Sequence, residues 1–427
     1  MKYGLIGEHL GHSFSKQIQT RIAEIENVKD YDYQLVELNK EEFKEFIEKK
    51  DFKGINVTIP YKKDVIPYLD EMDESAKAIG AVNTIINVDG KLKGFNTDFG
   101  GFLYMVKAHN VHMEGKKVLI IGNGGACAAV KAVCEHENAK DIVIVSRSAN
   151  RGAISYDEMY TSHLDADIIV NTSPVGMYPN IMNATVDVSW FHKLECVLDV
   201  VYNPILTRLC FEAQESNIKR VIGLEMLIAQ AKYTFEIFEN MSFDDSIIDE
   251  IKKEMLKDRC NIVLIGMPSA GKTTIGKMLE EKLGKEFIDL DDMIIAKAGK
   301  SIPEIFQESG EAGFRAIETE VAIEASKMNN KIIATGGGVV KHKVNMDFLH
   351  LNGITIFIDR DIDKLISSDP NRPLSSSKKA LQQMHKERYP LYQKYAAYVA
   401  VNNANVEETV DDIVNAYHSI LIDTVAE

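Results

Sequence analysis

Four residues beyond the middle of the chain have the types and spacing of a phosphate-binding loop. Gly266, Gly271, Lys272 and Thr273 fill the pattern G-x-x-x-x-G-K-[ST]. A glycine-rich turn exposes backbone N–H groups to phosphate oxygens, and the following helix points its positive end at the same place. The lysine reaches the outer phosphates of ATP, and the threonine hydroxyl binds Mg²⁺. We therefore predict an ATP site in this loop, which also contains Ser269, Ala270 and Thr274.

A second glycine-rich turn has the character of a dinucleotide site. Gly122, Gly124 and Gly125 allow a tight turn and close approach to a pyrophosphate, and Ala126 is small enough for a helix to pack on the preceding strand. The third glycine of the G-x-G-x-x-G pattern is replaced by Cys127. The turn therefore predicts dinucleotide binding, although it matches the pattern only in part.

Two arginines indicate which dinucleotide would bind. The next strand, residues 141–145, is followed by Arg147, and Arg151 comes shortly afterwards. Sites that prefer NAD place an acidic residue here for the ribose 2′-hydroxyl, whereas arginines suit a 2′-phosphate. The pattern indicates NADP; the alternative is that both arginines are surface residues of a loop.

Polar residues of the N-terminal segment form two candidate binding groups. Ser13 and Ser15 are two hydroxyls in a turn, and the alternative interpretation is a helix N-cap. Thr58 and Lys62 follow a strand, near the carboxyl end where α/β sheets bind ligands. The alternative for Lys62 is a solvated lysine.

Asparagines and an aspartate beside glycines form a third group in the same segment. Asn83 follows Gly80, and Asn96 and Asp98 follow Gly94. Such residues bind polar ligands in some sites, but beside glycines they are commonly turn residues. The residues alone leave both interpretations open.

Charged residues after the phosphate-binding loop complete the candidate chemistry. Asp289 and Asp291 end a strand as a Mg²⁺ or hydroxyl-acceptor site requires, and strand alternation predicts that they lie on the same side. The alternative is an acidic loop. Arg315 and Glu318, spaced i,i+3 on a predicted helix, could simply pair. A strand at residues 332–335 ends in three glycines, where the backbone approaches another group closely, and residues 367–374 have the profile of a lid containing Arg372.

The elements that carry these residues indicate an α/β protein with several domains. Short strands alternate with helical patterns, and 427 residues exceed one ordinary core. The net charge of −15 disfavours nucleic acid and anionic membranes as main partners. The chain lacks the features of a signal peptide or transmembrane helix, and its five cysteines form no C-x-x-C pair. We expect a cytoplasmic protein; the oligomeric state, monomer or homodimer, stays open.

Residues 1–240 resemble shikimate dehydrogenase. The segments that carry the resemblance occur in the family's order and spacing: Ser13/Ser15, NVTIPYK, GAVNT, NTD, GNGGA, SRS with Arg151, NTSPVGM, DVVYNP and GLEMLIAQA. The resemblance implies NADPH-dependent reduction of 3-dehydroshikimate to shikimate, with Lys62 and Asp98 as the catalytic pair. It implies substrate binding by Ser13, Ser15, Thr58, Asn83, Asn96, Tyr202 and Gln230. It also implies NADP binding by Gly122, Gly124, Gly125, Ala126, Arg147, Arg151 and Gly223.

Residues 260–420 resemble shikimate kinase, through the segments GMPSAGKTT, FIDLDD, SIPEIFQESGEAGFRAIE, ATGGGVV, NRPL and RYPLY. This resemblance implies MgATP-dependent phosphorylation of the shikimate 3-hydroxyl. It implies metal placement by Thr273 and Asp289, and an Asp291 that binds the acceptor hydroxyls and takes the proton. Arg315 and Arg388 would clamp the carboxylate, Gly337 and Gly338 would line the acceptor site, and Arg372 would be the lid arginine that contacts ATP.

The two resemblances together predict a fold and a domain order. We expect an α/β fold: an N-terminal substrate domain at 1–98, onto which helices 224–240 pack back, a Rossmann NADP-binding domain at 99–223, and a P-loop kinase domain with a parallel sheet at 259–427. The helical spacing of residues 246–257 predicts a helical connector at 241–258 rather than a flexible tether.

The sequence departs from the patterns of the two families at three positions. Lys16 stands where proline is usual, Glu225 where glycine is common, and Ser375 where a second lid leucine is usual. Because Glu225 lies near the expected nicotinamide edge, cofactor affinity is in question. The alternative functions are a quinate/shikimate-type dehydrogenase of relaxed specificity fused to a related kinase, and a binding protein with inactive sites.

Overall fold

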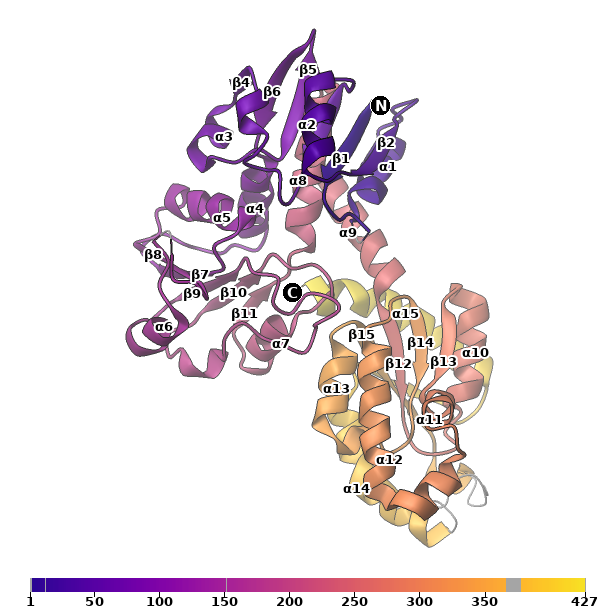
Figure 1. Cartoon of the computed structure of the whole chain (residues 1–427). Helices are drawn as coiled ribbons and strands as arrows, with labels where there is room; N and C mark the ends of the chain where they lie inside the picture. Colours follow the sequence, from indigo (N-terminus) through magenta and orange to yellow (C-terminus); the bar gives the residue numbers. More distant parts are fainter. Residues whose placement is uncertain (1, 12, 151, 366–377, 427) are drawn as a thin grey trace. The chain divides into compact units, whose positions relative to one another are not determined.

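The computed structural model describes residues 2–11, 13–150, 152–365 and 378–426. The chain divides into two compact units. Unit 1 comprises residues 1–177, 183–202 and 212–254, and unit 2 comprises 178–182, 203–211 and 255–427. Three β-sheets and their helices make up these units (Figure 1). In the described part of the chain, no helix is both long and apolar enough to cross a lipid bilayer.

The first sheet of unit 1 has the strand order β2-β1-β3-β5-β6-β4. Its strands are β1 (Tyr3–Gly7), β2 (Tyr33–Glu37), β3 (Gly54–Val57), β4 (Glu71–Met72), β5 (Thr84–Val88) and β6 (Lys91–Phe95). The helices of this region are α1 (Ser15–Ile25), α2 (Lys40–Lys49) and α3 (Glu74–Ile79). A capping box between Asn39 and Glu42 starts α2, since each side chain bonds the other's backbone N–H.

This first sheet is mixed rather than wholly parallel. Strand β1 pairs in parallel with β2 and β3, whereas β5 is antiparallel to both β3 and β6. The β5–β6 hairpin is not among the elements expected from the sequence. Its signal is the Asp89-Gly90 pair between two apolar alternations, and both residues have the positive φ that a tight hairpin turn requires.

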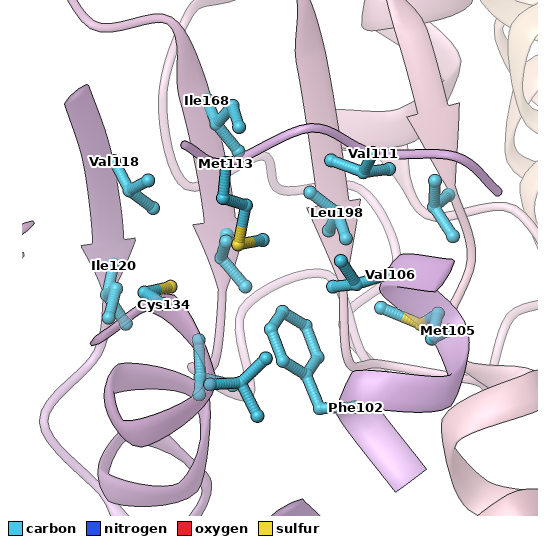
Figure 2. Close-up of a cluster of buried hydrophobic side chains, with 14 of the residues drawn as sticks. Phe102, Met105, Val106, Val111, Met113, Val118, Ile120, Cys134, Ile168 and Leu198 are labelled. Atoms are coloured by element: carbon cyan, nitrogen blue, oxygen red, sulfur yellow. The ribbon is translucent and has the colours of Figure 1, made fainter. Parts of the chain in front are cut away.

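The second sheet of unit 1 is parallel, with the order β11-β10-β9-β7-β8. Its strands are β7 (Lys117–Ile121), β8 (Asp141–Val145), β9 (Ile168–Asn171), β10 (Cys196–Asp199) and β11 (Lys219–Val221). The helices are α4 (Thr97–Ala108), α5 (Gly125–His136), α6 (Tyr156–Ser162), α7 (Arg208–Glu215), which enters unit 1 at Glu212, and α8 (Leu224–Glu239). Figure 2 shows one core of this region, in which Phe102 and Met105 of α4 pack with strand residues such as Ile120 and Leu198.

Helices α4 and α8 approach each other closely at Gly101. A Cβ atom added there would lie 2.7 Å from the Met226 carbonyl oxygen and 2.9 Å from Gln230 Cβ. Backbone atoms of α8 cannot give way as a flexible side chain would, so the glycine sets the spacing of the two helices.

Gly101→Ala is therefore expected to lower the free energy of unfolding of unit 1 by roughly 1–3 kcal/mol, the usual cost of forcing extra volume into a packed core. Urea unfolding followed by the fluorescence of Trp190, the single tryptophan, measures this. Gly11→Ala is the control, because a Cβ there meets nothing within 4 Å and its backbone is not left-handed. Equal midpoints for the two variants would contradict the prediction.

The sheet of unit 2 is parallel, with the order β13-β14-β12-β15-β16. Its strands are β12 (Asn261–Ile265), β13 (Glu286–Asp289), β14 (Lys331–Ala334), β15 (Gly353–Asp359) and β16 (Tyr398–Val401). The helices are α10 (Lys272–Leu283), α11 (Leu290–Ala298), α12 (Ile302–Ser326), α13 (Lys343–His350), α14 (Lys378–Tyr395) and α15 (Val406–Ala426). Strand β12 is buried along its length, as a central parallel strand should be. The predicted α/β fold with a parallel kinase sheet is confirmed.

Helix α9 (Ser246–Arg259) is a continuous helix, and its C-terminal end is held by a buried lysine. Lys285 Nζ donates to the carbonyl oxygens of Lys257 and Cys260, at 2.7 and 3.0 Å, and to Asn330 Oδ1 at 2.7 Å. Lys285 is only 3% exposed, and burial lowers the pKa of its ammonium group from 10.5 to about 8.

The stability of unit 2 should therefore depend on the titration of Lys285. Between pH 8 and 10.5 the unfolded chain keeps a proton that the folded chain has lost, so stability rises with pH across this window, by up to about 3 kcal/mol. Lys285→Met should remove this slope. Because burial raises the pKa of the Cys260 thiol to about 12 and so gives an opposite slope, the measurement is the difference between wild type and variant from pH 7 to 10. Hydrogen exchange of β12–β15 peptides in urea measures the stability of unit 2 in both proteins. If the stabilities of wild type and Lys285→Met change with pH in parallel, the prediction is refuted.

Candidate functional site

In unit 1, the candidate catalytic residues meet at one point. Lys62 Nζ donates to Asp98 Oδ2 at 2.6 Å, and Asn83 Nδ2 donates to Asp98 Oδ1 at 2.9 Å. Both oxygens of Asp98 therefore have a donor, which fixes the orientation of its carboxylate. Only 17% of the Lys62 side chain and 11% of the Asp98 side chain are exposed, so the interpretation of Lys62 as a solvated lysine is wrong.

The start of α4 positions Asp98. Asn96 is the N-cap of α4, and its Oδ1 accepts from the Asp98 backbone N–H at 3.1 Å. Asn96 Nδ2 in turn donates to the Ala81 carbonyl oxygen at 2.9 Å. Asn96 is thus a helix cap, as one of the two interpretations holds. Because this cap fixes the first turn of α4, it also directs the Asp98 side chain toward Lys62.

Another candidate substrate residue, Gln230, lies near the start of α4. Thr97 Oγ1 lies 3.5 Å from Gln230 Oε1, which brings α8 to the start of α4. Thr58 follows β3, the strand that leads toward Lys62. Buried hydroxyls of Thr84, Thr97 and Thr234 bond one another beneath these residues and hold the two helices to the sheet.

Ser13 and Ser15 lie at the start of α1, but neither caps it. The N-cap residue is Phe14, without a side-chain cap bond, so the interpretation as a serine N-cap is wrong. Ser13 Oγ instead lies 3.1 Å from Ser15 Oγ and accepts from the Ser15 backbone N–H at 3.2 Å. The ring of Phe14, between the two serines, packs edge-on against Tyr202 at 5.7 Å, which places Tyr202 beside them.

The dinucleotide turn has the geometry that the sequence predicts. Gly122 has φ of 113°, and a Cβ there would lie 2.9 Å from the Ser173 backbone nitrogen. Gly124 is the N-cap of α5, and a Cβ added to it would meet nothing within 4 Å. Gly125 faces Lys62, whose Cδ lies 3.7 Å from the position of a Cβ. The turn therefore adjoins the Lys62–Asp98 pair.

The residues present fit a dinucleotide with a phosphate on its ribose. Ser146 follows β8 and is buried, and its Oγ has no hydrogen-bond partner in the described part of the chain. Arg147 is exposed beside it, and Ala126 is half-buried in the first turn of α5. Arg151 lies outside the described residues. Cys127, in place of the third glycine, packs into the hydrophobic core with Phe102 and Ile120, and burial raises its thiol pKa to about 11.

Gly223 and Glu225 lie at the start of α8. A Cβ at Gly223, the N-cap, would lie 2.5 Å from the Val200 carbonyl, so only glycine permits this approach to the end of β10. Glu225 is 3% exposed, and its carboxylate bonds His109 and Lys252. Its negative charge is therefore matched by neighbours within unit 1.

In unit 2, the phosphate-binding loop lies between β12 and α10, as predicted. Gly266 and Gly271 have φ of 147° and 103°, and a Cβ on either would lie 2.6 Å from a neighbouring atom. Lys272 Nζ bonds the carbonyl oxygens of Gly266 and Met267 at 2.9 and 3.0 Å. Ser269, Ala270 and Thr274 belong to the same strand–loop–helix segment.

Thr273 and Asp289 bring together two oxygen atoms that could bind a metal ion beside this loop. Thr273 Oγ1 lies 3.0 Å from Asp289 Oδ2. In the described part of the chain, no cluster of three or more His, Cys, Asp or Glu residues could hold a metal. Mg²⁺, however, prefers oxygen ligands and keeps several waters, so one hydroxyl and one carboxylate beside a triphosphate loop suit it.

Asp291 reaches the site from a helix, not from the strand that the sequence analysis assumed. Strand β13 ends at Asp289, whose side chain caps α11 by accepting from the Asp291 backbone N–H at 3.0 Å. Asp289 and Asp291 are therefore not related by strand alternation, and that prediction is wrong. The aspartate favours a helix cap because its side chain satisfies a free N–H at the helix start.

Arg315, Arg388 and the glycines at 336–338 lie in the same part of unit 2 as Asp291. Arg315 Nη1 donates to Glu318 Oε2 at 2.7 Å, so the pairing considered as an alternative does exist. A Cβ on Gly338 would lie 2.2 Å from the Arg315 guanidinium, and Arg388 Nη1 donates to the Gly337 carbonyl oxygen at 3.0 Å. Arg372 and Ser375 lie outside the described residues.

Glu318 is a residue of this site that sequence reasoning left aside. A Cβ on Gly336 would lie 3.1 Å from both Asp291 Oδ1 and Glu318 Oε1, so the two carboxylates face the same glycine. Burial raises the pKa of Glu318, and neighbouring Asp291 adds to the increase. Glu318 Oε1 and Arg388 Nε are buried without a hydrogen-bond partner among the described residues, so both atoms could bond a polar ligand. The signal in the sequence was its i,i+3 spacing from Arg315.

Comparisons with known proteins agree with this division of the chain. Residues 5–85 match the family described as the shikimate dehydrogenase substrate binding domain, and residues 268–418 match shikimate kinase. A shikimate dehydrogenase (NADP(+)) of Clostridium perfringens is 37% identical over 266 residues, which cover 59% of this chain and 97% of the relative.

Solved structures give the same result for the first part of the chain. A chorismate mutase/shikimate 5-dehydrogenase fusion protein from Clostridium acetobutylicum is 39% identical with a TM-score of 0.57, covering 59% of this chain and 96% of the other. The shikimate 5-dehydrogenase of Thermus thermophilus, solved with NADP(H) and shikimate, is 26% identical with a TM-score of 0.54, covering 60% of this chain and 99% of the other.

Proposed function

Because this chain belongs to the shikimate dehydrogenase family and also carries a shikimate kinase domain, we propose that Lys62 and Asp98 form the catalytic pair of the first enzyme. The two enzymes catalyse steps of the shikimate pathway, and the first uses NADP. The observation that carries the proposal is the 2.6 Å contact of Lys62 with Asp98 beside Gly125 of the dinucleotide turn.

In this mechanism the hydride that reduces the ketone of 3-dehydroshikimate would come from bound NADPH. Negative charge then builds on the ketone oxygen, and a proton donor at that oxygen lowers the barrier. Lys62 Nζ donates the proton, while Asp98, oriented by Asn83, holds the ammonium group in place. The hydroxyls and carboxylate of the substrate are bound by Ser13, Ser15, Thr58, Asn83, Asn96, Tyr202 and Gln230.

The dinucleotide would be held by the turn after β7 and by the residues after β8. Gly122, Gly124, Gly125 and Ala126 offer backbone N–H groups to the pyrophosphate. Arg147, the Ser146 hydroxyl and Arg151 would bind the ribose phosphate, and Gly223 would contact the nicotinamide end. The unpartnered Ser146 Oγ supports this assignment.

The second enzyme transfers phosphate from ATP to the shikimate 3-hydroxyl. Arg315 and Arg388 bind the carboxylate of shikimate, because planar guanidinium groups bind carboxylates with two parallel hydrogen bonds. Asp291 accepts the hydroxyl proton, and Gly337 and Gly338 line the acceptor site. Lys272 would hold the outer phosphates, Arg372 would bind ATP, and Thr273 and Asp289 would hold Mg²⁺, which would neutralise charge on the phosphates.

The proposed function also assigns a role to each part of the chain. The functional domains are the substrate domain at 1–98 with helices 224–240, the NADP-binding domain at 99–223, the connector at 241–258 and the kinase at 259–427. The protein acts in the cytoplasm on small molecules. Its function requires neither nucleic acid nor a membrane.

The test of this function mixes the purified protein with 3-dehydroshikimate and NADPH, first without and then with MgATP. Loss of NADPH absorbance without ATP, and shikimate 3-phosphate only with ATP, are the expected results. Quinate with NAD⁺ is the comparison reaction, and preferred turnover of quinate would favour a dehydrogenase of relaxed specificity. Stable NADPH and no phosphorylated product would overturn the proposal.

A further inference from the structure

A buried cluster of charged residues in unit 1 has no part in the chemistry proposed above. Glu225 is 3% exposed and Lys252 is 7% exposed, and the Lys252 ammonium group donates to Glu225 Oε1. Glu225 Oε2 lies 2.5 Å from His109 Nε2. The three residues come from the start of α8, the middle of α9 and the C-cap of α4. One buried carboxylate thus joins three helices.

The cluster depends on both partners of Glu225. Burial opposes ionisation of this carboxyl group, but His109 and Lys252 outweigh it, and the pKa of Glu225 is lowered. Glu225 is also in the first turn of α8, where the helix dipole favours a negative charge. A buried ion pair that loses one member leaves an uncompensated charge, so the surrounding structure must move to admit water.

The helices that meet at this cluster carry the proposed dehydrogenase site. Helix α4 has Asp98 in its first turn and is followed by His109. Helix α8 carries Gln230, and Gly101 fixes its close approach to α4. A shift of α8 relative to α4 would therefore move Gln230 relative to Asp98.

Other contacts fasten α9 to the same unit. Lys232 of α8, itself 3% exposed, donates to Asp245 Oδ1 at 2.8 Å and to the Phe243 carbonyl oxygen at 2.7 Å, just before α9 begins. Arg21 of α1 binds Glu254 at 2.7 Å. Residues 246–254 of α9 are therefore packed as part of unit 1, not as an exposed connection.

We propose that Lys252 is a positioning residue of the dehydrogenase: by holding Glu225, it fixes α8 against α4 and so places Gln230 for substrate binding. The connecting helix is thereby a working component of the first enzyme. The inference deepens the proposed function and rests on its assignment of Gln230 to the substrate.

The experiment compares Lys252→Met with Lys253→Met in the full-length chain. Lys253 is the matched control, because it is the adjacent residue of the same helix and is exposed. For Lys252→Met we expect the KM for shikimate, with NADP⁺ as oxidant, to rise about tenfold while kcat stays within about threefold. The Kd for NADP⁺ should stay within about threefold, because the turn at residues 122–126 supplies most of the dinucleotide contacts, and the kinase activity should not change. Lys253→Met should match wild type in all four measurements.

A rescue variant separates positioning from a general loss of folding. In Glu225→Gln/Lys252→Met the buried charge is gone and the amide still bonds His109, so the KM should return to within about threefold of wild type. An unchanged KM in Lys252→Met, even with a lower Tm, would overturn the inference, as would a double variant no better than the single one. If wild type itself does not oxidise shikimate, the proposed function fails instead.

Discussion

Lys62→Met is expected to abolish most dehydrogenase activity, lowering kcat for shikimate oxidation by about 10²–10⁴-fold, the usual contribution of a positioned acid–base group. The variant removes the ammonium group that lies 2.6 Å from Asp98 and keeps most of the volume of the side chain. The affinity for NADP⁺ should stay close to wild type, because the turn at residues 122–126 binds the dinucleotide through its backbone. Kinase activity should be unaffected.

Lys63→Met is the matched control for this variant. Lys63 is the next residue and is exposed, so its loss should leave kcat and KM unchanged. The measurements are NADP⁺ reduction by absorbance and NADP⁺ binding by fluorescence titration. A Lys62→Met enzyme whose kcat stays within threefold of wild type would show that another group transfers the proton.

The parts of the site that could be predicted from sequence are those in which chemistry and structure share one short segment. The loop from Gly266 to Thr273 requires a strand before it and a helix after it, and β12 and α10 are there. The turn at Gly122 and Gly124 similarly joins β7 to α5. In such motifs the backbone conformation is local, so glycine spacing and apolar runs are sufficient.

The parts that could not be predicted depend on contacts between distant segments. Lys62 and Asp98 are 36 residues apart, and only a family resemblance suggested that they meet. Asp291 was predicted to continue the strand, because the residues around it do not show where the strand ends. In the structure Asp289 ends the strand and caps the helix that contains Asp291. From the sequence, Glu225 put the cofactor affinity in question. Nothing close to it in the sequence indicates that Lys252, 27 residues later, bonds its carboxylate.

Asp291→Asn is expected to remove most kinase activity, again by about 10²–10⁴ in kcat, because the amide cannot accept the proton of the attacking hydroxyl. The carboxylate of Asp291 faces Gly336 together with Glu318, and Arg315 and Arg388 lie around them. Since the two arginines and the phosphate-binding loop are retained, the affinities for shikimate and ATP should change much less than kcat. Phosphoryl transfer depends on the position and charge of such groups, so an isosteric change isolates the proton acceptor.

Asp292→Asn provides the control for this last variant, since Asp292 is the adjacent residue of α11 and is exposed. It removes one negative charge from the same helix turn without touching Asp291, and it should keep the wild-type kcat. The measurement is shikimate 3-phosphate formation at saturating ATP, with ATP affinity determined separately by calorimetry. If both variants lose activity equally, the negative charge of the helix start is what matters. If neither does, Asp291 is not the proton acceptor, and Glu318, whose raised pKa reflects its burial in the same site, becomes the residue to replace.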